Sequence, residues 1–268
     1  MNSHKAALII IVKEAIISLQ YLYPRLTMSD TLQGDKVMNH LIAECYDFIK
    51  DCRLTYALCG GYALELFTNK KTRTHSDVDI TLFNEDRKAI VDFVLNKGWN
   101  VYEHLHSENC LRKITNPGDE RIQNCFYLWA INPDCSFFKI EPKSGVNHYF
   151  NFEILDNEQK NFDFIDIIFN DRKDGKFICN KEGDISRELN KAILYHKNIP
   201  YLAPEVILFF ISNPAYIESE YHREKNNIDF ASAPYSLSRE SMDWLIKSIE
   251  KTYPEGNKRL DQLKIIQK

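Results

Sequence analysis

The chain has 268 residues, of which 44% are hydrophobic and 27% charged, so it has the composition of an ordinary globular protein with room for one large or two modest domains. Its formal net charge of −4 argues against a partner bound mainly through a phosphate backbone, although a local basic patch would escape this count. Nothing approaches the roughly 20 consecutive apolar residues that span a bilayer. The seven cysteines include no CxxC pair, so we expect reduced thiols in a cytoplasmic protein rather than disulfides or a zinc knuckle.

Helical periodicity opens the chain. Residues 5–23 place apolar side chains at helical spacing, but Lys13 and Glu14 interrupt the apolar run and no small-residue cleavage site follows. This pattern predicts an amphipathic helix rather than a signal peptide. A second helix is predicted over 35–51.

Short strands and helices alternate in the next part of the chain. In chain order, the pattern predicts a strand at 54–59, a helix at 62–67, a strand at 77–83 and a helix at 85–97. Aromatic and β-branched residues then predict strands at 99–103, 124–131, 148–155, 162–169 and 177–179, with hairpin connections at 156–160 and 173–176.

From Ile185 onward the periodicity becomes helical. The predicted helices are 185–196, 204–211 and 239–252, and prolines separate them. These elements predict an α/β (α+β) fold, with a mixed β-sheet core flanked by helices and followed by a helical C-terminal domain. The expected domains are an N-terminal helical extension at 1–34, a main domain at 35–184 and the helical domain at 185–268.

Gly60-Gly61 lies between a predicted strand and a predicted helix. The N–H groups at a helix start have no partner within the helix, and glycine allows a phosphate to approach them closely. A Gly-Gly turn is also common as a simple structural bend, so on its own it is a weak indication of phosphate binding.

Asp77 and Asp79 flank Val78 on the second predicted strand, so their side chains share one face about 6.5–7 Å apart. Two such carboxylates repel each other and raise each other's pKa unless a cation lies between them, and Mg²⁺ prefers oxygen ligands of this kind. Alone, the motif also fits an exposed strand edge. The apolar residues Val78, Ile80 and Leu82 on the other face imply that the strand is covered there, which favours a functional site.

The combined pattern resembles the aminoglycoside and lincosamide nucleotidyltransferases, a group within the polymerase-β-like nucleotidyltransferase superfamily. The residues that carry the resemblance are Gly60, Gly61, Ala63, Leu64, Thr72, Arg73, His75, Asp77 and Asp79. Further similarity lies in Ile199–Phe210, Arg223–Phe230 and Trp244–Pro254, so the resemblance covers residues 36–260. The chain has Gly61-Tyr62 where the superfamily has Gly-Ser, so backbone groups must do more of the phosphate binding.

The resemblance implies a magnesium-dependent enzyme that transfers a nucleoside monophosphate, AMP from ATP in the commonest case, to a hydroxyl of a small molecule such as an aminoglycoside or lincosamide. It also implies a third carboxylate on a neighbouring strand. The segment 162–170 supplies Asp163 and Asp166, which a strand places on opposite faces. Asp166 is preferred, because it would otherwise be an uncompensated charge in an apolar strand, whereas Asp163 lies near the strand start.

Two-metal phosphoryl transfer is the implied mechanism. Asp77 and Asp79 would bridge two Mg²⁺ ions, and Asp166 would hold one of them and accept the proton of the acceptor hydroxyl. Gly60 and Gly61 would bind the nucleotide, together with Arg73, His75 and Lys225, although structural or solvent-exposed roles stay open for these last three. For Tyr127 and Trp129, core packing is preferred over a place in the acceptor pocket.

Two alternatives belong to other classes. A toxin-type or abortive-infection nucleotidyltransferase acting on RNA or protein should carry a basic surface, which the composition does not indicate. A nucleotide-binding protein without turnover is disfavoured because all three carboxylates are present. No local motif encodes the acceptor, the preferred base or the oligomeric state.

Overall fold

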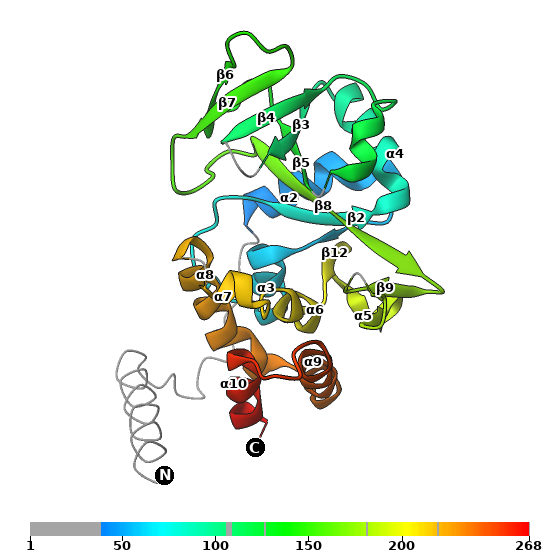
Figure 1. Ribbon diagram of the computed structural model, residues 1–268, viewed down its shortest axis with the longest axis vertical. Coiled ribbons are helices and arrows are strands. Elements are labelled where there is room, and N and C mark those ends of the chain that lie inside the picture. Colours follow the sequence, from blue (N-terminus) through cyan, green and yellow to red (C-terminus); the bar gives the residue numbers. More distant parts are fainter. Residues whose placement is uncertain (1–38, 106–108, 126, 181, 219, 268) are drawn as a thin grey trace. The chain divides into compact units, whose positions relative to one another are not determined.

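The computed structural model describes residues 39–268 apart from 106–108, 126, 181, 219 and 268 (Figure 1). The predicted helix at 5–23 and the extension at 1–34 lie outside these residues. Residues 38–268 form one compact unit. Within the described residues, no helix is long and apolar enough to cross a membrane.

The described strands form one mixed sheet in the spatial order β11-β12-β1-β2-β8-β5-β3-β4-β7-β6, with β9 and β10 attached beside β8. They are β1 (Ala57–Leu58), β2 (Asp79–Phe83), β3 (Asn100–Leu105), β4 (Cys110–Ile114), β5 (Tyr127–Ile131), β6 (Phe138–Pro142), β7 (Tyr149–Ile154), β8 (Phe164–Lys173), β9 (Lys176–Ile178), β10 (Ser186–Glu188), β11 (Ile193–His196) and β12 (Ile199–Leu202). The pairs β2–β8 and β1–β12 are parallel, whereas the other pairs in the sheet are antiparallel.

Helices surround the sheet. The α-helices are α2 (His40–Ile49), α3 (Gly60–Thr68), α4 (Arg87–Asn96), α5 (Leu189–Ala192), α6 (Pro204–Phe210), α7 (Pro214–Glu218), α8 (Glu220–Ser232), α9 (Arg239–Thr252) and α10 (Lys258–Ile266). Single turns of 3₁₀-helix lie at Lys50–Cys52, Asn84–Asp86, Glu120–Asn124 and Ala233–Ser236. The predicted mixed α/β fold class is therefore confirmed.

The central strands separate two clusters of buried side chains. Ile165 and Ile167 of β8 pack in the larger cluster with apolar residues of α2, α3, α4, α6 and α9, whereas Phe164 packs with Trp129 and Tyr102 in a second, aromatic cluster. Alternation along β8 therefore gives the sheet two different faces, as a period-2 strand requires. The carboxylate of Asp166 lies on the face of the aromatic cluster.

The predicted helix at 185–196 is wrong. This segment forms β10, the short α5 and β11, and β11 pairs with β12 in a hairpin. The hairpin turns at Lys197 and Asn198, both with positive φ, 48° and 70°. Glycine is the usual sequence signal for a hairpin turn with positive φ, and this turn contains no glycine. Strands β11 and β12 therefore belong to the sheet although they follow residue 185.

Most of the other predicted elements are present with shifted ends. The predicted helix at 239–252 has the bounds of α9, whose first turn is capped by Ser238 through a 3.1 Å hydrogen bond from Ser241 N. Strand β2 begins at Asp79 rather than at residue 77. The strands β4, β6 and β12 and the helices α7, α8 and α10 were not predicted.

Candidate active site

Two aspartates lie side by side where β2 and β8 run parallel. The register places Asp79 opposite Asp166, and Asp166 N donates a 3.0 Å hydrogen bond to Val78 O. Residues paired in this way are on neighbouring strands about 4.8 Å apart, and their side chains leave the same face of the sheet. Ile80 and Leu82 of β2 are buried, and the burial of each side chain stabilises the fold by roughly 2 kcal/mol. Because a slip of one residue would expose both side chains, their burial fixes the register of β2.

Asp77 completes a group of three carboxylates. It lies just before β2, two residues from Asp79 along the chain. Burial and the charges of Asp77 and Asp166 raise the pKa of Asp79 well above its ordinary value. Burial and the charge of Asp77 raise the pKa of Asp166 to about 8. The three carboxyl groups predicted from the sequence are therefore close enough to repel one another when ionised.

Asp166 has an unsatisfied oxygen. Within the described residues, Asp166 Oδ1 and the neighbouring Trp129 Nε1 are both buried without a hydrogen-bond partner. The indole N–H of Trp129 lies close enough to lower the pKa of Asp166, against the larger effect of burial. A buried acceptor without a partner is costly and marks a position where a ligand atom would be stabilised.

Asp163, the other candidate for the third carboxylate, is placed differently. Its Oδ2 accepts hydrogen bonds from Ser136 N at 3.0 Å and from Ser136 Oγ at 2.8 Å. It is buried three residues before Asp166, on the connection into β8. Its contacts are those of a residue that fastens the start of a strand to a loop.

Gly60 and Gly61 face side chains of the site. Gly60 begins α3 with a φ of +61°, and a Cβ there would lie less than 3.0 Å from Asp79 Oδ2. A Cβ on Gly61 would be equally close to Arg73 Nη2 and to the ring of His75. Glycine at both positions leaves room for Asp79, Arg73 and His75 to approach the helix start closely. The N–H groups of this helix start lie beside the carboxylates.

The loop between α3 and β2 is fastened by Glu65. Its Oε1 accepts a 2.9 Å hydrogen bond from Thr72 N and lies 3.0 Å from His75 Nε2. Burial alone would raise the pKa of Glu65, but these interactions lower that pKa below its ordinary value. The ring of Tyr62 packs against His75 with centroids 4.2 Å apart, and His75 is buried. His75 thus holds the loop that leads into Asp77.

Arg73 and Lys225 connect this loop with α8. Arg73 makes two hydrogen bonds to Asp229 of α8, from Nε at 3.2 Å and from Nη2 at 3.1 Å. Lys225, on the same helix, lowers the pKa of both Asp79 and Asp166 through its positive charge. Glu65 and Asp229 are site residues that the sequence analysis missed, although both lie within segments that carry the resemblance.

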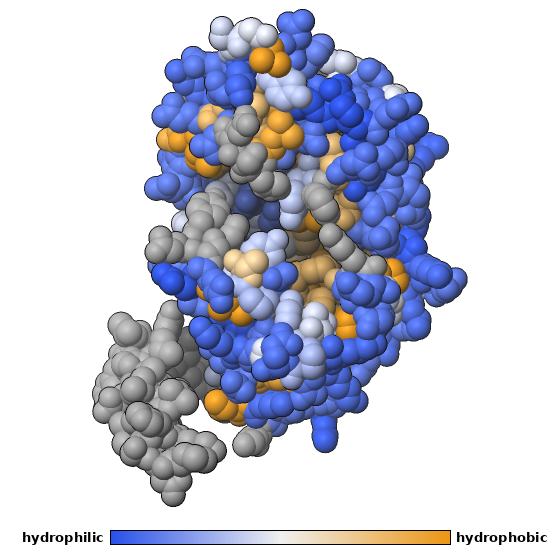
Figure 2. All heavy atoms as spheres, in the orientation of Figure 1, coloured by the Kyte–Doolittle hydropathy of each residue, from blue (hydrophilic) through white to orange (hydrophobic). Residues whose placement is uncertain are grey.

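An aromatic surface adjoins the carboxylates on the same face of the sheet. Trp129 is opposite Asp166 on β5, and its ring stacks on His104 at 4.3 Å and on Phe138 at 5.1 Å between centroids. Only 8% of Trp129 is exposed, which is the core packing preferred from the sequence. Tyr127 is partly buried, and burial and a hydrogen bond with Tyr216 raise its pKa. Figure 2 shows a hollow in the molecular surface between the β3–β7 part of the sheet and helices α7 and α8.

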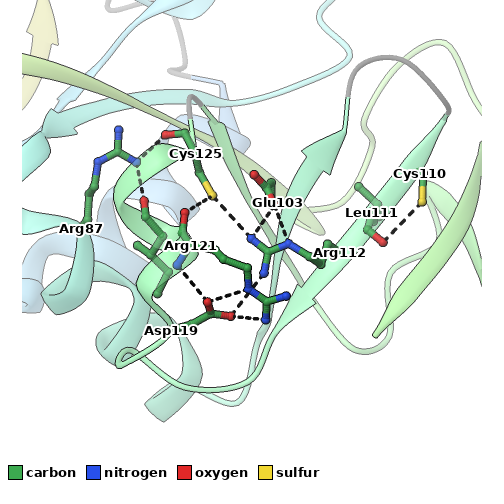
Figure 3. Close-up of polar contacts among 9 residues, drawn as sticks. Arg87, Glu103, Cys110, Leu111, Arg112, Asp119, Arg121 and Cys125 are labelled. Atoms are coloured by element: carbon green, nitrogen blue, oxygen red, sulfur yellow. Dashed lines mark hydrogen bonds and ion pairs between the residues drawn. The ribbon is translucent and has the colours of Figure 1, made fainter. Parts of the chain in front are cut away.

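A second polar network lies away from the carboxylates and supports the sheet (Figure 3). Arg112 of β4 donates to Glu103 at 2.6 Å and to Asp119 at 3.3 Å, and Arg121 also binds Asp119, at 2.7 Å. Hydrogen bonding from Arg121 lowers the pKa of Asp119 to about 2. This network has the geometry of a structural ion-pair cluster that joins β3 and β4 to the loop at 119–125.

The donor chemistry fits a divalent cation. Within the described part of the chain, no group of three or more His, Cys, Asp and Glu side chains is already arranged with metal-ligand spacing. The unpartnered Oδ1 of Asp166 and the raised pKa values of Asp79 and Asp166 are nevertheless what a positive charge would compensate. Carboxylate oxygens are the ligands that Mg²⁺ prefers.

A sheet that pairs two aspartates beside a diglycine helix start is the arrangement expected from the resemblance to nucleotidyltransferases. The sequence match agrees: residues 41–113 match the family model of aminoglycoside-2''-adenylyltransferase. This confirms the resemblance to the aminoglycoside and lincosamide nucleotidyltransferase group, on the segment that holds Gly60, Gly61, Asp77 and Asp79.

Several solved structures are similar at low identity. The lincomycin-bound crystal structure of the lincosamide antibiotic adenylyltransferase LnuA is 15% identical and covers 71% of this chain and 95% of its own, with a TM-score of 0.40. The solution structure of the antibiotic-resistance factor ANT(2'')-Ia is 14% identical, covers 83% and 96%, and has a TM-score of 0.41. The Megavirus polyadenylate synthase is 12% identical, covers 94% and 44%, and has a TM-score of 0.35. No curated protein matches the chain significantly.

Proposed function

We propose that this protein transfers a nucleoside monophosphate, AMP from ATP, to a hydroxyl group of a small acceptor of the aminoglycoside or lincosamide kind. The observation that carries the proposal is the pairing of Asp79 with Asp166 on parallel strands, with Asp77 beside them. The family match over residues 41–113 supports the same reaction class. Because the reaction consumes ATP, we place the protein in the cytoplasm.

Residues of the site can be assigned to the steps of the proposed reaction. The acceptor oxygen bonds to the α-phosphorus, the bond from that phosphorus to the bridging oxygen breaks, and diphosphate leaves. The hydroxyl proton passes to the carboxylate of Asp166, whose buried Oδ1 has no hydrogen-bond partner among the described residues. Lys225 and the N–H groups of Gly60 and Gly61 bind the triphosphate. His75 keeps the loop before Asp77 in place.

Asp77, Asp79 and Asp166 would hold Mg²⁺, which supplies Lewis acidity and neutralises the negative charge of the triphosphate. The residues themselves orient the reacting groups and exclude part of the water from the site. Electrostatic interactions are stronger where water is excluded. Their mutual repulsion in the absence of the cation is the energetic reason for expecting them to bind it.

The test is transfer from labelled ATP to a panel of aminoglycosides and lincosamides, beginning with tobramycin and lincomycin. Asp79→Asn and Asp166→Asn should each lower the transfer rate by about a hundredfold or more, the size of effect seen when one group of a preorganised charged site is removed. Asp163→Asn is the matched control, because the Asp163 side chain accepts hydrogen bonds from Ser136 and lies just before the strand that carries Asp166. It should lose stability and keep its transfer rate.

Two results would end the proposal. One is a wild-type protein that transfers from no nucleoside triphosphate to any acceptor in the panel. The other is undiminished transfer by the Asp79 and Asp166 variants. Labelling of RNA or of protein in the same assay would instead assign the function to the alternative class, which the net charge of −4 does not favour.

A further inference from the structure

The guanidinium of Arg73 is engaged within the protein. Nε and Nη2 bind the two carboxylate oxygens of Asp229, and Nη1 donates a 3.2 Å hydrogen bond to Thr74 O. The side chains of Arg73 and Asp229 are 15% and 5% exposed. A two-bond fork between partly desolvated charges is stronger and more directional than an exposed ion pair. Arg73 therefore fixes the position of Asp229.

Asp229 lies one helical turn after Lys225 on α8. Residues four apart on a helix share a face, so a contact that holds Asp229 also orients the side of α8 that carries Lys225. Lys225 lowers the pKa of both Asp79 and Asp166 with its charge, whereas the charge of Arg73 has a smaller effect, on Asp79. The other side of α8 is held separately, because Arg259 donates a 2.6 Å hydrogen bond to Asn227 and packs over the ring of Phe230.

The start of α3 also leaves room for the Arg73 side chain to reach Asp229. A Cβ at Gly61 would collide with Arg73 Nη2, so the guanidinium crosses directly against the helix start. The loop, the diglycine and α8 thus meet at one side chain.

We propose, on the basis of the proposed function, that Arg73 is a positioning residue. Its pair with Asp229 holds α8 so that Lys225 stays close enough for its charge to act on Asp79 and Asp166. Arg73 then acts on a bound triphosphate only through Lys225. This differs from the sequence-based expectation, in which Arg73 neutralises the triphosphate itself.

A mutant cycle on ATP binding separates the two roles. The dissociation constant of MgATP is measured by calorimetry, without acceptor, for the full-length wild type, Arg73→Gln, Asp229→Asn and Lys225→Met. The two variants of the pair should weaken ATP binding by about tenfold, as expected for loss of one charged hydrogen bond to phosphate. In the Lys225→Met background, neither Arg73→Gln nor Asp229→Asn should weaken binding further.

A direct contact between Arg73 and the triphosphate predicts the opposite. Arg73→Gln would then weaken binding equally in the Lys225→Met background, and Asp229→Asn would leave binding unchanged or improve it. Either result overturns the inference. If the neutral variants do not fold, Arg73→Lys enters the same cycle, because it keeps the charge and one contact with Asp229. Its effect should also vanish when Lys225 is replaced.

The matched control for loss of a buried ion pair is Arg187→Gln. Arg187 of β10 binds Glu205 of α6 at 2.7 Å, and their side chains are 7% and 3% exposed. This variant should melt at a lower temperature with unchanged ATP affinity. Because the readout is binding, a wild type that binds ATP but transfers nothing refutes the proposed function and leaves the cycle to decide the role of Arg73.

Discussion

Replacement of Gly60 by alanine tests how closely the helix start and the carboxylates are fitted together. Gly60 has a φ of +61°, a conformation that costs an alanine about 1–2 kcal/mol. The added Cβ would also collide with Asp79 Oδ2 and lie 3.0 Å from Asp79 Cγ. The backbone at Asp79 is held by a 2.9 Å hydrogen bond from Cys59 N to its carbonyl, so the side chain must rotate instead.

The total follows from these two contributions. An off-rotamer side chain costs about 0.5–1.5 kcal/mol, which brings the expected loss of unfolding free energy for Gly60→Ala to about 1.5–3.5 kcal/mol. Displacement of Asp79 should lower the transfer rate of the folded variant by about a hundredfold. Urea unfolding measures the first quantity and a transfer assay, corrected for the folded fraction, measures the second.

Gly98→Ala is the matched control. Gly98 has a φ of +81°, and no atom of the described residues lies within 4 Å of an added Cβ, so this variant carries only the conformational cost of about 1–2 kcal/mol. It should keep its full transfer rate. If the two variants are equally destabilised and equally active, then Asp79 does not depend on the space beside Gly60, and the description of the site given above is incorrect.

Four further predictions concern charge. Without Mg²⁺, the melting temperature of the wild type should fall, relative to Asp166→Asn, as the pH rises from about 4 to about 8. The pKa of Asp166 is about 8 when folded and 3.8 when unfolded, so the folded state keeps a proton that the unfolded state has lost. Mg²⁺ at pH 8 should raise the melting temperature of the wild type and not that of Asp166→Asn; equal gains would contradict a metal site there. Glu65→Gln should lower the unfolding free energy by about 1–2 kcal/mol in urea titrations and slow transfer, because the loop at His75 loses its charged anchor; an unchanged transfer rate would show that the loop needs no such anchor. Arg112→Ala should lower the unfolding free energy by about 3 kcal/mol, because Glu103 is left partly buried without its partner, yet transfer by the folded protein should be unchanged; a small loss in the same titrations would contradict it.

The sequence was sufficient for those parts of the site that are local in the chain. Asp79 lies at the start of a strand with an apolar opposite face, Asp77 lies just before it, and Asp166 interrupts a run of apolar residues. In both cases the alternation that defines the strand also defines which side the carboxylate leaves. Parallel pairing of β2 with β8 then brings Asp79 opposite Asp166.

The contacts that the sequence did not indicate are long-range or lie in weakly patterned segments. Arg73 and Asp229 are 156 positions apart, and no local pattern marks them as partners. Helix α8 contains the run Arg223 to Asn227, which has no apolar residue, so its helical period gives little signal. The β11–β12 hairpin was missed because Ile193 to His196 continues a helical pattern and its turn contains no glycine. Tertiary pairing decided each of these elements.

The parallel pairing of β2 with β8 also determines when activity can arise during synthesis and refolding. The two facing aspartates come from strands separated by α4 and by β3 to β7, so no short fragment of the chain contains a working site. Pairing over such a separation is slow because the intervening chain must first be ordered. A nascent chain should therefore stay inert until β8 has emerged and joined the sheet, and activity should return late in refolding, no earlier than the pairing of β2 with β8.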